Sequence, residues 1–131
     1  YRMVSVNTAL QVDIMGQVCS QYIGYKHFSG TGGQLDTHRG AQLSEGGRGI
    51  IALRSTAKED SISTIVPFLS EGAEVTVPSH DVDTVVTEYG VADLKGLCLR
   101  DRALALIKIA HPKFQGQIKE EAMRLGIVPH F

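Results

Sequence analysis

The sequence predicts an α/β or α+β domain, in which a layered β-sheet is followed by two helices. Three observations support this class. Segments rich in β-branched residues run through residue 92, and the segments after it repeat apolar residues with a helical period. The length of 131 residues suits about one domain. We find no internal repeat or linker, so residues 1–131 are expected to form a single domain.

The predicted strands alternate apolar and polar residues or form short apolar runs. A turn with the sequence SEGGRG at residues 44–49 precedes one of the apolar runs. Pro67 lies inside another run and favours an edge strand or a bend there. The five to seven strands are expected within residues 3–14, 17–28, 50–56, 62–69, 74–79 and 82–92.

Two amphipathic helices are predicted at the end of the chain. The first covers residues 99–111 and carries a stripe that includes Leu106 and Ile107. Pro112 ends it, because proline disfavours helical backbone in the residue before it. The second covers residues 114–126 and stops at Gly126.

Composition excludes several classes of function. The net charge is −1, with 13 basic and 14 acidic residues, so we expect neither nucleic acid nor an anionic membrane as a partner. No apolar run is long enough to span a bilayer. The histidines show no metal-binding spacing, so no metal is expected. Cys19 and Cys98 are far apart and read as reduced thiols of a cytoplasmic protein.

The glycine-rich stretch HFSGTGGQLDTHRGA, residues 27–41, is the first candidate site. It matches neither the phosphate-binding P-loop nor the dinucleotide fingerprint, because both need a helix directly after the glycines. The next regular element is expected to be a strand, so a helix dipole is excluded as the anion-binding group. Backbone N–H groups of a tight glycine turn could still bind an anion.

Two charged residues are further candidates, each with a plainer alternative. Glu88 closes a β-branched run just before a glycine, where a carboxylate can be held near a site or can simply be solvated. Lys58 lies in a polar loop after a buried strand, and it is either a binding group or a solvated surface lysine.

Several segments taken together resemble the acetyl-CoA hydrolase/transferase family, which includes acetate, butyrate and 4-hydroxybutyrate CoA-transferases. The resemblance runs in order over nearly the whole chain, and it is carried by SVNTALQVDIMGQV, SGTGGQLD, STAKEDSISTIVP, VVTEYGVADLKG and LIKIAHPKF. It implies the C-terminal part of the family's second domain, with a CoA-transferase-like sheet layered with helices. The chain begins in an apparent strand without Met, so we expect a piece of a longer polypeptide.

The resemblance also implies a reaction. A glutamate carboxylate attacks an acyl-CoA thioester to form a mixed anhydride, and the released CoA thiolate returns to give a glutamyl-CoA thioester. A small carboxylic acid then takes the CoA by the reverse steps. Coenzyme A is thus a substrate, acyl-CoA and a small acid are the partners, and the full-length enzyme is expected to be a homo-oligomer.

The family's site residues carry over position by position. Gly33 resembles the glycine whose amide contacts the acyl oxygen or CoA, and Glu88 resembles a secondary site glutamate. Lys58 resembles a CoA-contacting lysine, and Asn7 a site asparagine. Ser29 resembles the position whose backbone carbonyl contacts CoA, and its neighbours Gly30 and Gly32 are expected to bind CoA with it.

The family's nucleophilic glutamate has no counterpart here. It lies in a GIHSE-like or GIHTE-like segment upstream of the matching region, and this sequence contains no such segment. We therefore expect the chain alone to be inactive. An acetyl-CoA hydrolase, a non-catalytic CoA-binding module, and a structural domain that pairs with a chain supplying the nucleophile remain alternatives.

Overall fold

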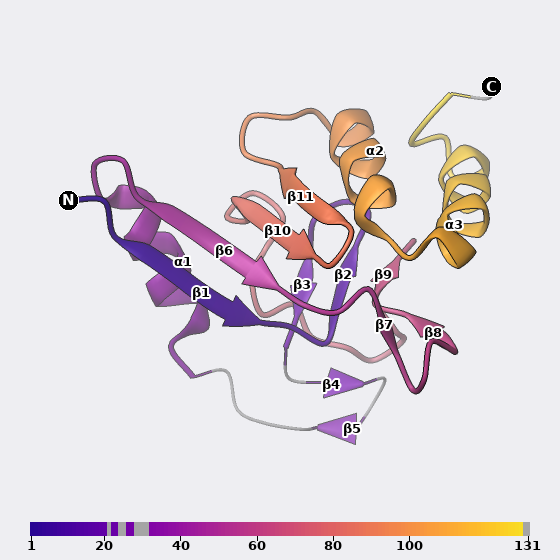
Figure 1. The fold of residues 1–131 in the computed structure, drawn as a ribbon, viewed down its shortest axis with the longest axis horizontal. Helices are drawn as coiled ribbons and strands as arrows, with labels where there is room; N and C mark the ends of the chain where they lie inside the picture. The colour runs from indigo at the N-terminus through magenta and orange to yellow at the C-terminus, as the bar shows by residue number, and fades with distance from the viewer. Residues whose placement is uncertain (21, 24–25, 28–31, 130–131) are drawn as a thin grey trace.

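A four-stranded mixed sheet organises the computed structural model, which describes residues 1–20, 22–23, 26–27 and 32–129 (Figure 1). Its order is β1 (Val4–Thr8), β6 (Arg48–Ala52), β10 (Thr84–Thr87) and β11 (Gly90–Asp93). The first three strands are parallel, and β11 runs antiparallel to β10. The ends of β1, β6 and β10 therefore meet at one edge of the sheet, called here the carboxyl edge. The predicted α/β class is confirmed.

Smaller pieces of sheet surround this centre. A second sheet has the order β3 (Val18–Cys19), β2 (Gln11–Asp13) and β9 (Ile65–Val66). Two ribbons pair β4 (Tyr22–Ile23) with β5 (Lys26–His27), and β7 (Thr56–Ala57) with β8 (Ile62–Ser63). Several predicted strands are therefore divided between sheets. Residues 3–14, for example, supply β1 to the first sheet and β2 to the second.

Two of the predicted strands differ more strongly from the structure. Residues 82–92 form a hairpin of β10 and β11, with Glu88 and Tyr89 in the connecting turn. Residues 74–79 contain no strand, and their pairing is the single bridge between Val18 and Val77. Two of the three β-branched residues in this segment, Thr76 and Val77, are buried, so they indicate burial rather than strand pairing.

Helix α1 (Gln34–Leu43) begins within the glycine-rich stretch, directly after Gly32 and Gly33. The expectation that a strand comes next is therefore wrong, and so is the exclusion of a helix N-terminus as an anion-binding group. The covered face of α1 carries Leu35, His38 and Ala41, which are three residues apart. Histidine in the middle of this face interrupts the apolar pattern, which hides the helical period.

A buried contact joins α1 to the sheet. His38 Nε2 accepts a hydrogen bond from the backbone N–H of Asp83 at 3.1 Å, and the Asp83 carboxylate accepts one from the N–H of Gly49 at 3.0 Å. Burial lowers the pKa of His38, although the carboxylates of Asp83 and Asp81 act against this. The imidazole lies on β6 at Gly49, where a Cβ atom would stand 2.6 Å from His38 Nδ1. Glycine is therefore required there for close approach.

The two predicted C-terminal helices are confirmed as α2 (Leu99–Ile109) and α3 (Pro112–Arg124). His111 does more than end α2, because its Nδ1 accepts a hydrogen bond from Lys113 N and caps α3. None of the helices among the described residues is long and apolar enough to cross a membrane. One buried apolar cluster joins both helices to the strands; it includes Val12, Ile14, Ile51, Ile65, Val85, Leu94, Leu106 and Ile118.

Replacing Gly49 by Ala should destabilise the chain by about 1–3 kcal/mol, because the new methyl group overlaps the His38 ring. The matched control is Gly40→Ala in α1, where a Cβ atom meets nothing within 4 Å. That change should stabilise the helix by about 0.5–1 kcal/mol. Chemical denaturation of both variants measures the difference. Equal stability of the two would show that α1 does not depend on this approach.

Candidate functional site

Several predicted site residues lie along the carboxyl edge of the sheet. Asn7 lies near the end of β1, Glu88 follows β10, and Gly33 begins α1. In open α/β sheets, ligands bind outside the carboxyl ends of the strands. The edge is thus the candidate site on grounds of topology alone.

Asn7 connects β1 to the start of α1. Its side-chain amide donates to Thr37 Oγ1 at 3.3 Å and to Ser5 Oγ at 3.0 Å. Gln34, in the first turn of α1, donates from Nε2 to the carbonyl of Thr8 at 3.2 Å. These contacts hold the N-terminus of α1 against the end of β1.

Gly33 is the N-cap residue of α1, and no side chain caps the helix there. The first amides of a helix lack intrahelical partners and carry the positive end of the dipole, so they attract anions. A Cβ atom at Gly33 would meet nothing within 4 Å, whereas Gly32 has a φ of +58°, which favours glycine. Ser29 and Gly30 lie outside the described residues.

Glu88 is held by the loop that follows β6. Its Oε1 accepts a hydrogen bond from Ser55 N at 2.7 Å, and its Oε2 lies 4.0 Å from Nε of Arg54. Burial acts to raise the pKa of this carboxyl, but the hydrogen bonds and Arg54 outweigh it, so the pKa lies below its ordinary value. Glu88 is therefore an anion near neutral pH, suited to accept hydrogen bonds and to orient a donor.

The sequence reasoning missed Ser55, which is fully buried. Its amide fixes Glu88, and its hydroxyl also lowers the pKa of that carboxyl without reaching full hydrogen-bond geometry. The signal was present in the polar Arg54–Ser55 pair directly after a buried strand, since such loops carry binding groups. The strand predicted over residues 50–56 includes this pair, whereas the structure places it between β6 and β7.

Lys58 lies farther along the chain, in the loop between β7 and β8. Lys58, Glu59 and Asp60 have φ values of 49°, 57° and 64°, an uncommon run for residues with side chains. The loop is held by Thr56 Oγ1, which donates to Asp60 Oδ1 at 2.5 Å, and by Lys113 Nζ, which donates to the Asp60 carbonyl at 3.2 Å.

These loop residues line a hollow of about 340 Å³ together with Arg54. Because Arg54 also lies beside Glu88, the hollow adjoins the candidate site. No described residue forms a hydrogen bond or ion pair with the exposed Lys58 side chain. Its ammonium group is thus available to an anion.

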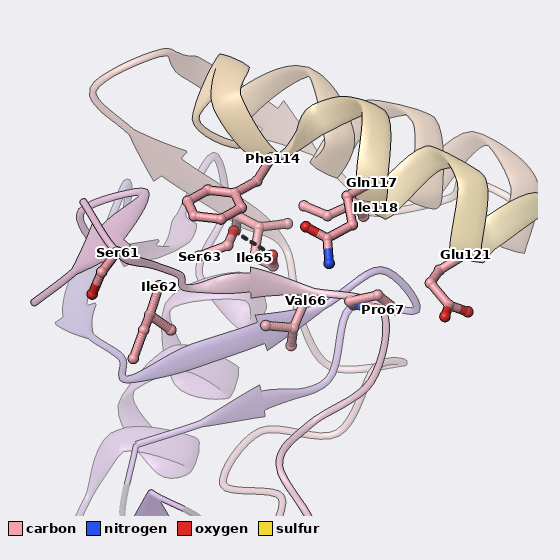
Figure 2. A pocket seen from close by; sticks show the side chains of 10 residues that line it. All are labelled: Ser61, Ile62, Ser63, Ile65, Val66, Pro67, Phe114, Gln117, Ile118 and Glu121. Atoms are coloured by element: carbon pink, nitrogen blue, oxygen red, sulfur yellow. Dashed lines mark hydrogen bonds between the residues drawn. The ribbon is translucent and has the colours of Figure 1, made fainter.

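Two other features lie apart from the edge. Burial raises the pKa of Asp13 to about 6, but its carboxylate accepts hydrogen bonds from the amides of Met15 and Gln17, so this group shapes a turn. Figure 2 shows a mainly apolar pocket of about 270 Å³ between α3 and the β8–β9 segment, lined by residues such as Ile62, Phe114 and Ile118. It contains none of the predicted site residues.

The described residues contain no cluster of three or more histidine, cysteine, aspartate or glutamate side chains placed to hold a metal. The chemical resources of the edge are instead one fixed carboxylate, helix N-terminal amides, an asparagine amide and nearby cations. This set can bind an anionic ligand and can stabilise negative charge on a reacting oxygen.

Comparison with known proteins identifies several CoA-transferases that are similar to this chain. The sequence is 59% identical over 119 residues to a 4-hydroxybutyrate coenzyme A transferase of Clostridium kluyveri, covering 91% of this chain and 28% of that protein. It is 53% identical over 124 residues to a succinyl-CoA:cyclohexane-1-carboxylate CoA transferase of Geobacter metallireducens, with 95% and 28% covered. The chain thus spans about 28% of the length of these relatives.

Solved structures agree with the sequence comparison. A 4-hydroxybutyrate CoA-transferase from Porphyromonas gingivalis matches with a TM-score of 0.73 and 46% identity, over 94% of this chain and 27% of that chain. RipA from Yersinia pestis matches with a TM-score of 0.88 and 41% identity, over 95% and 28%. The family model named Acetyl-CoA hydrolase/transferase C-terminal domain matches residues 1–122. The chain therefore belongs to the acetyl-CoA hydrolase/transferase family, as a C-terminal domain.

Proposed function

We propose that this chain is the CoA-site part of a CoA-transferase that moves CoA between an acyl-CoA thioester and a small carboxylic acid. The acids considered are 4-hydroxybutyrate, butyrate and acetate, and the intermediate is a glutamyl-CoA thioester. The nucleophilic glutamate lies outside these 131 residues. Coenzyme A is a substrate of this reaction, and no metal takes part in it.

The observation that supports this proposal is the approach of α1 to the end of β1. It places the Gly33 amide and the Asn7 side chain at the same edge as Glu88. Attack on a thioester creates an oxyanion, which needs donors about 3 Å away that are in place before the reaction. Amides at a helix N-terminus meet that need, because their dipoles are already oriented.

Each residue then has a distinct role. The Gly33 amide donates to the reacting oxygen, and the absence of a side chain leaves room for the acyl group. Glu88 is anionic and fixed by Ser55, so it orients a donor near the reacting centre rather than supplying a proton. Lys58 binds a phosphate of CoA, and Asn7, Ser29, Gly30 and Gly32 complete the CoA contacts.

The active enzyme needs more polypeptide than this chain. Its partner is the N-terminal part of the same enzyme, which supplies the nucleophile, and the assembled enzyme is a cytoplasmic homo-oligomer. Residues 1–131 act in it as one domain. An acetyl-CoA hydrolase is the second candidate, because the family includes hydrolases. Access of water to the glutamyl thioester decides between transferase and hydrolase activity.

Trapping the glutamyl-CoA adduct of the full-length enzyme tests the proposal. The enzyme is incubated with acyl-CoA, the thioester is reduced or labelled, and the modified peptide is identified by mass spectrometry. We expect a glutamate outside residues 1–131 to carry the label, and the 131-residue chain to show no CoA transfer. A label within this region, or robust transfer by the chain alone, would contradict the proposal. Release of free acid without an acceptor would identify a hydrolase.

Replacing Gly33 by Val should lower the turnover of the full-length enzyme about a hundredfold, because the side chain enters the acyl site and displaces the oxyanion. Stability should change by no more than about 1 kcal/mol, because the new Cβ atom meets nothing within 4 Å in this chain. The control is Gly40→Val in the same helix, which also points into open space. Steady-state kinetics and thermal unfolding measure both effects. An unchanged rate for Gly33→Val would disprove the oxyanion role.

Replacing Lys58 by Ala should raise the KM for acyl-CoA roughly threefold to tenfold and leave kcat nearly unchanged, because a phosphate contact contributes equally to ground state and transition state. Lys95→Ala is the matched control, since that lysine is also exposed but lies in a different loop. Initial rates at varied acyl-CoA concentration give both constants. If KM stayed the same in both variants, Lys58 would not contact CoA.

A further inference from the structure

One face of the four-stranded sheet is apolar and uncovered by the described residues. It consists of Val4, Val6, Ile50, Ala52, Val86 and Val91, called here the outer face. Val4, Val6 and Val91 are 55%, 62% and 61% exposed. In Figure 1, α1 lies behind β1 and β6, and no described helix covers their front. The outer face thus spans the sheet from β1 at one edge to β11 at the other.

The pattern of β1 is inverted relative to a strand on the surface of a complete domain. Side chains alternate between the two faces of a strand, and apolar residues normally lie on the buried face. In β1, the covered face toward α1 carries the polar Ser5 and Asn7, whereas Val4 and Val6 point outward. Such an arrangement leaves apolar surface in water and favours a cover over the outward face.

The strand direction supports the same conclusion. Parallel sheets occur almost always with both faces covered, because their crossover connections place helices on them. Here α1 covers one face of the parallel strands β1 and β6, α2 contacts β10, and the other face of the sheet lacks a helical layer among the described residues. Contiguous apolar patches of this kind mark sites of protein contact.

The surroundings define the limits of the contact. At one end, Arg48 forms an ion pair with Asp93 at 3.2 Å, and Thr84 donates to the same carboxylate at 2.9 Å. On the β11 side, a groove of about 360 Å³ continues the outer face to Leu104 and Ala105 of α2. An element that covers the outer face therefore contacts an apolar centre and, at one corner, the polar group of Arg48, Thr84 and Asp93.

We infer that the outer face is the docking surface for the polypeptide that precedes this region in the full-length enzyme, an inference that rests on the proposed function. The chain is a C-terminal domain that spans 28% of the length of its relatives, so more than two thirds of the polypeptide is available as a cover. That polypeptide is joined to β1, which lies at the edge of the outer face. Because it is covalently attached, its effective concentration at the outer face is higher than that of any separate protein.

Thiol labelling of the full-length enzyme tests this docking. Cysteine is introduced by Val6→Cys on β1 or by Val91→Cys on β11, at opposite edges of the outer face. The control is Val75→Cys, because Val75 is 42% exposed and lies outside the sheet. Labelling rates under native conditions are read by mass spectrometry of the corresponding peptides. We expect the two outer-face thiols to react at least about tenfold more slowly than the control thiol.

Each result decides between the alternatives. Equal labelling rates at all three positions would overturn the docking. Protection from labelling that disappears on dilution would also overturn it, because a second copy of the enzyme would then be the cover. Protection independent of concentration supports it, and two positions guard against one variant that fails to fold. CoA transfer by the unmodified enzyme is measured separately. Transfer with unprotected thiols refutes the docking alone, and protection without transfer refutes the proposed function alone.

Discussion

The contact between His38 and Gly49 determines how the rest of this structure is arranged. Because Gly49 has no side chain, the imidazole lies directly on β6. Asp83, directly before β10, donates its backbone N–H to the imidazole and accepts a hydrogen bond from Gly49 N–H on β6. A helix held this closely cannot slide along the sheet without losing a buried hydrogen bond, which costs about 1–3 kcal/mol. The contact at His38, in the middle of α1, therefore fixes the position of the helix along its axis. It also fixes the height of the first turn of α1 relative to the carboxyl edge.

Fixing that height creates the candidate site. The first turn of α1 is joined to the end of β1 through Asn7 and Gln34, so its free amides open onto the edge where Glu88 lies. The two parts of the site rely on different interactions. The helix start supplies oriented dipoles, whereas the β6 loop uses Ser55 to hold a carboxylate in its charged form. The positive group is thus placed by a helix, whereas the carboxylate lies in a turn and is fixed by a loop residue.

Sequence patterns predicted the fold class and both C-terminal helices, because those helices have regular apolar stripes and a proline between them. They did not predict α1, whose inner face depends on a histidine that is apolar in effect because it is buried and neutral. They also missed the split of residues 3–14 between two sheets. For the site, Glu88 and Lys58 stood out as charged residues beside buried strands. Ser55 acts through its backbone amide, so only its position directly after a buried strand pointed to it.

The outer face and the carboxyl edge share a row of residues. Thr8, Ala52, Val86 and Val91 are in register across the four strands, and Glu88 lies two residues after Val86, in the turn that follows β10. The outer face therefore borders the Glu88 turn. The α1 amides reach the same edge from the opposite face. In the proposed enzyme, a thioester at the edge has its oxygen bound from the α1 side, while a nucleophile carried by the covering polypeptide approaches from the other side. The inverted pattern of β1 and the position of α1 would then serve one geometry of attack.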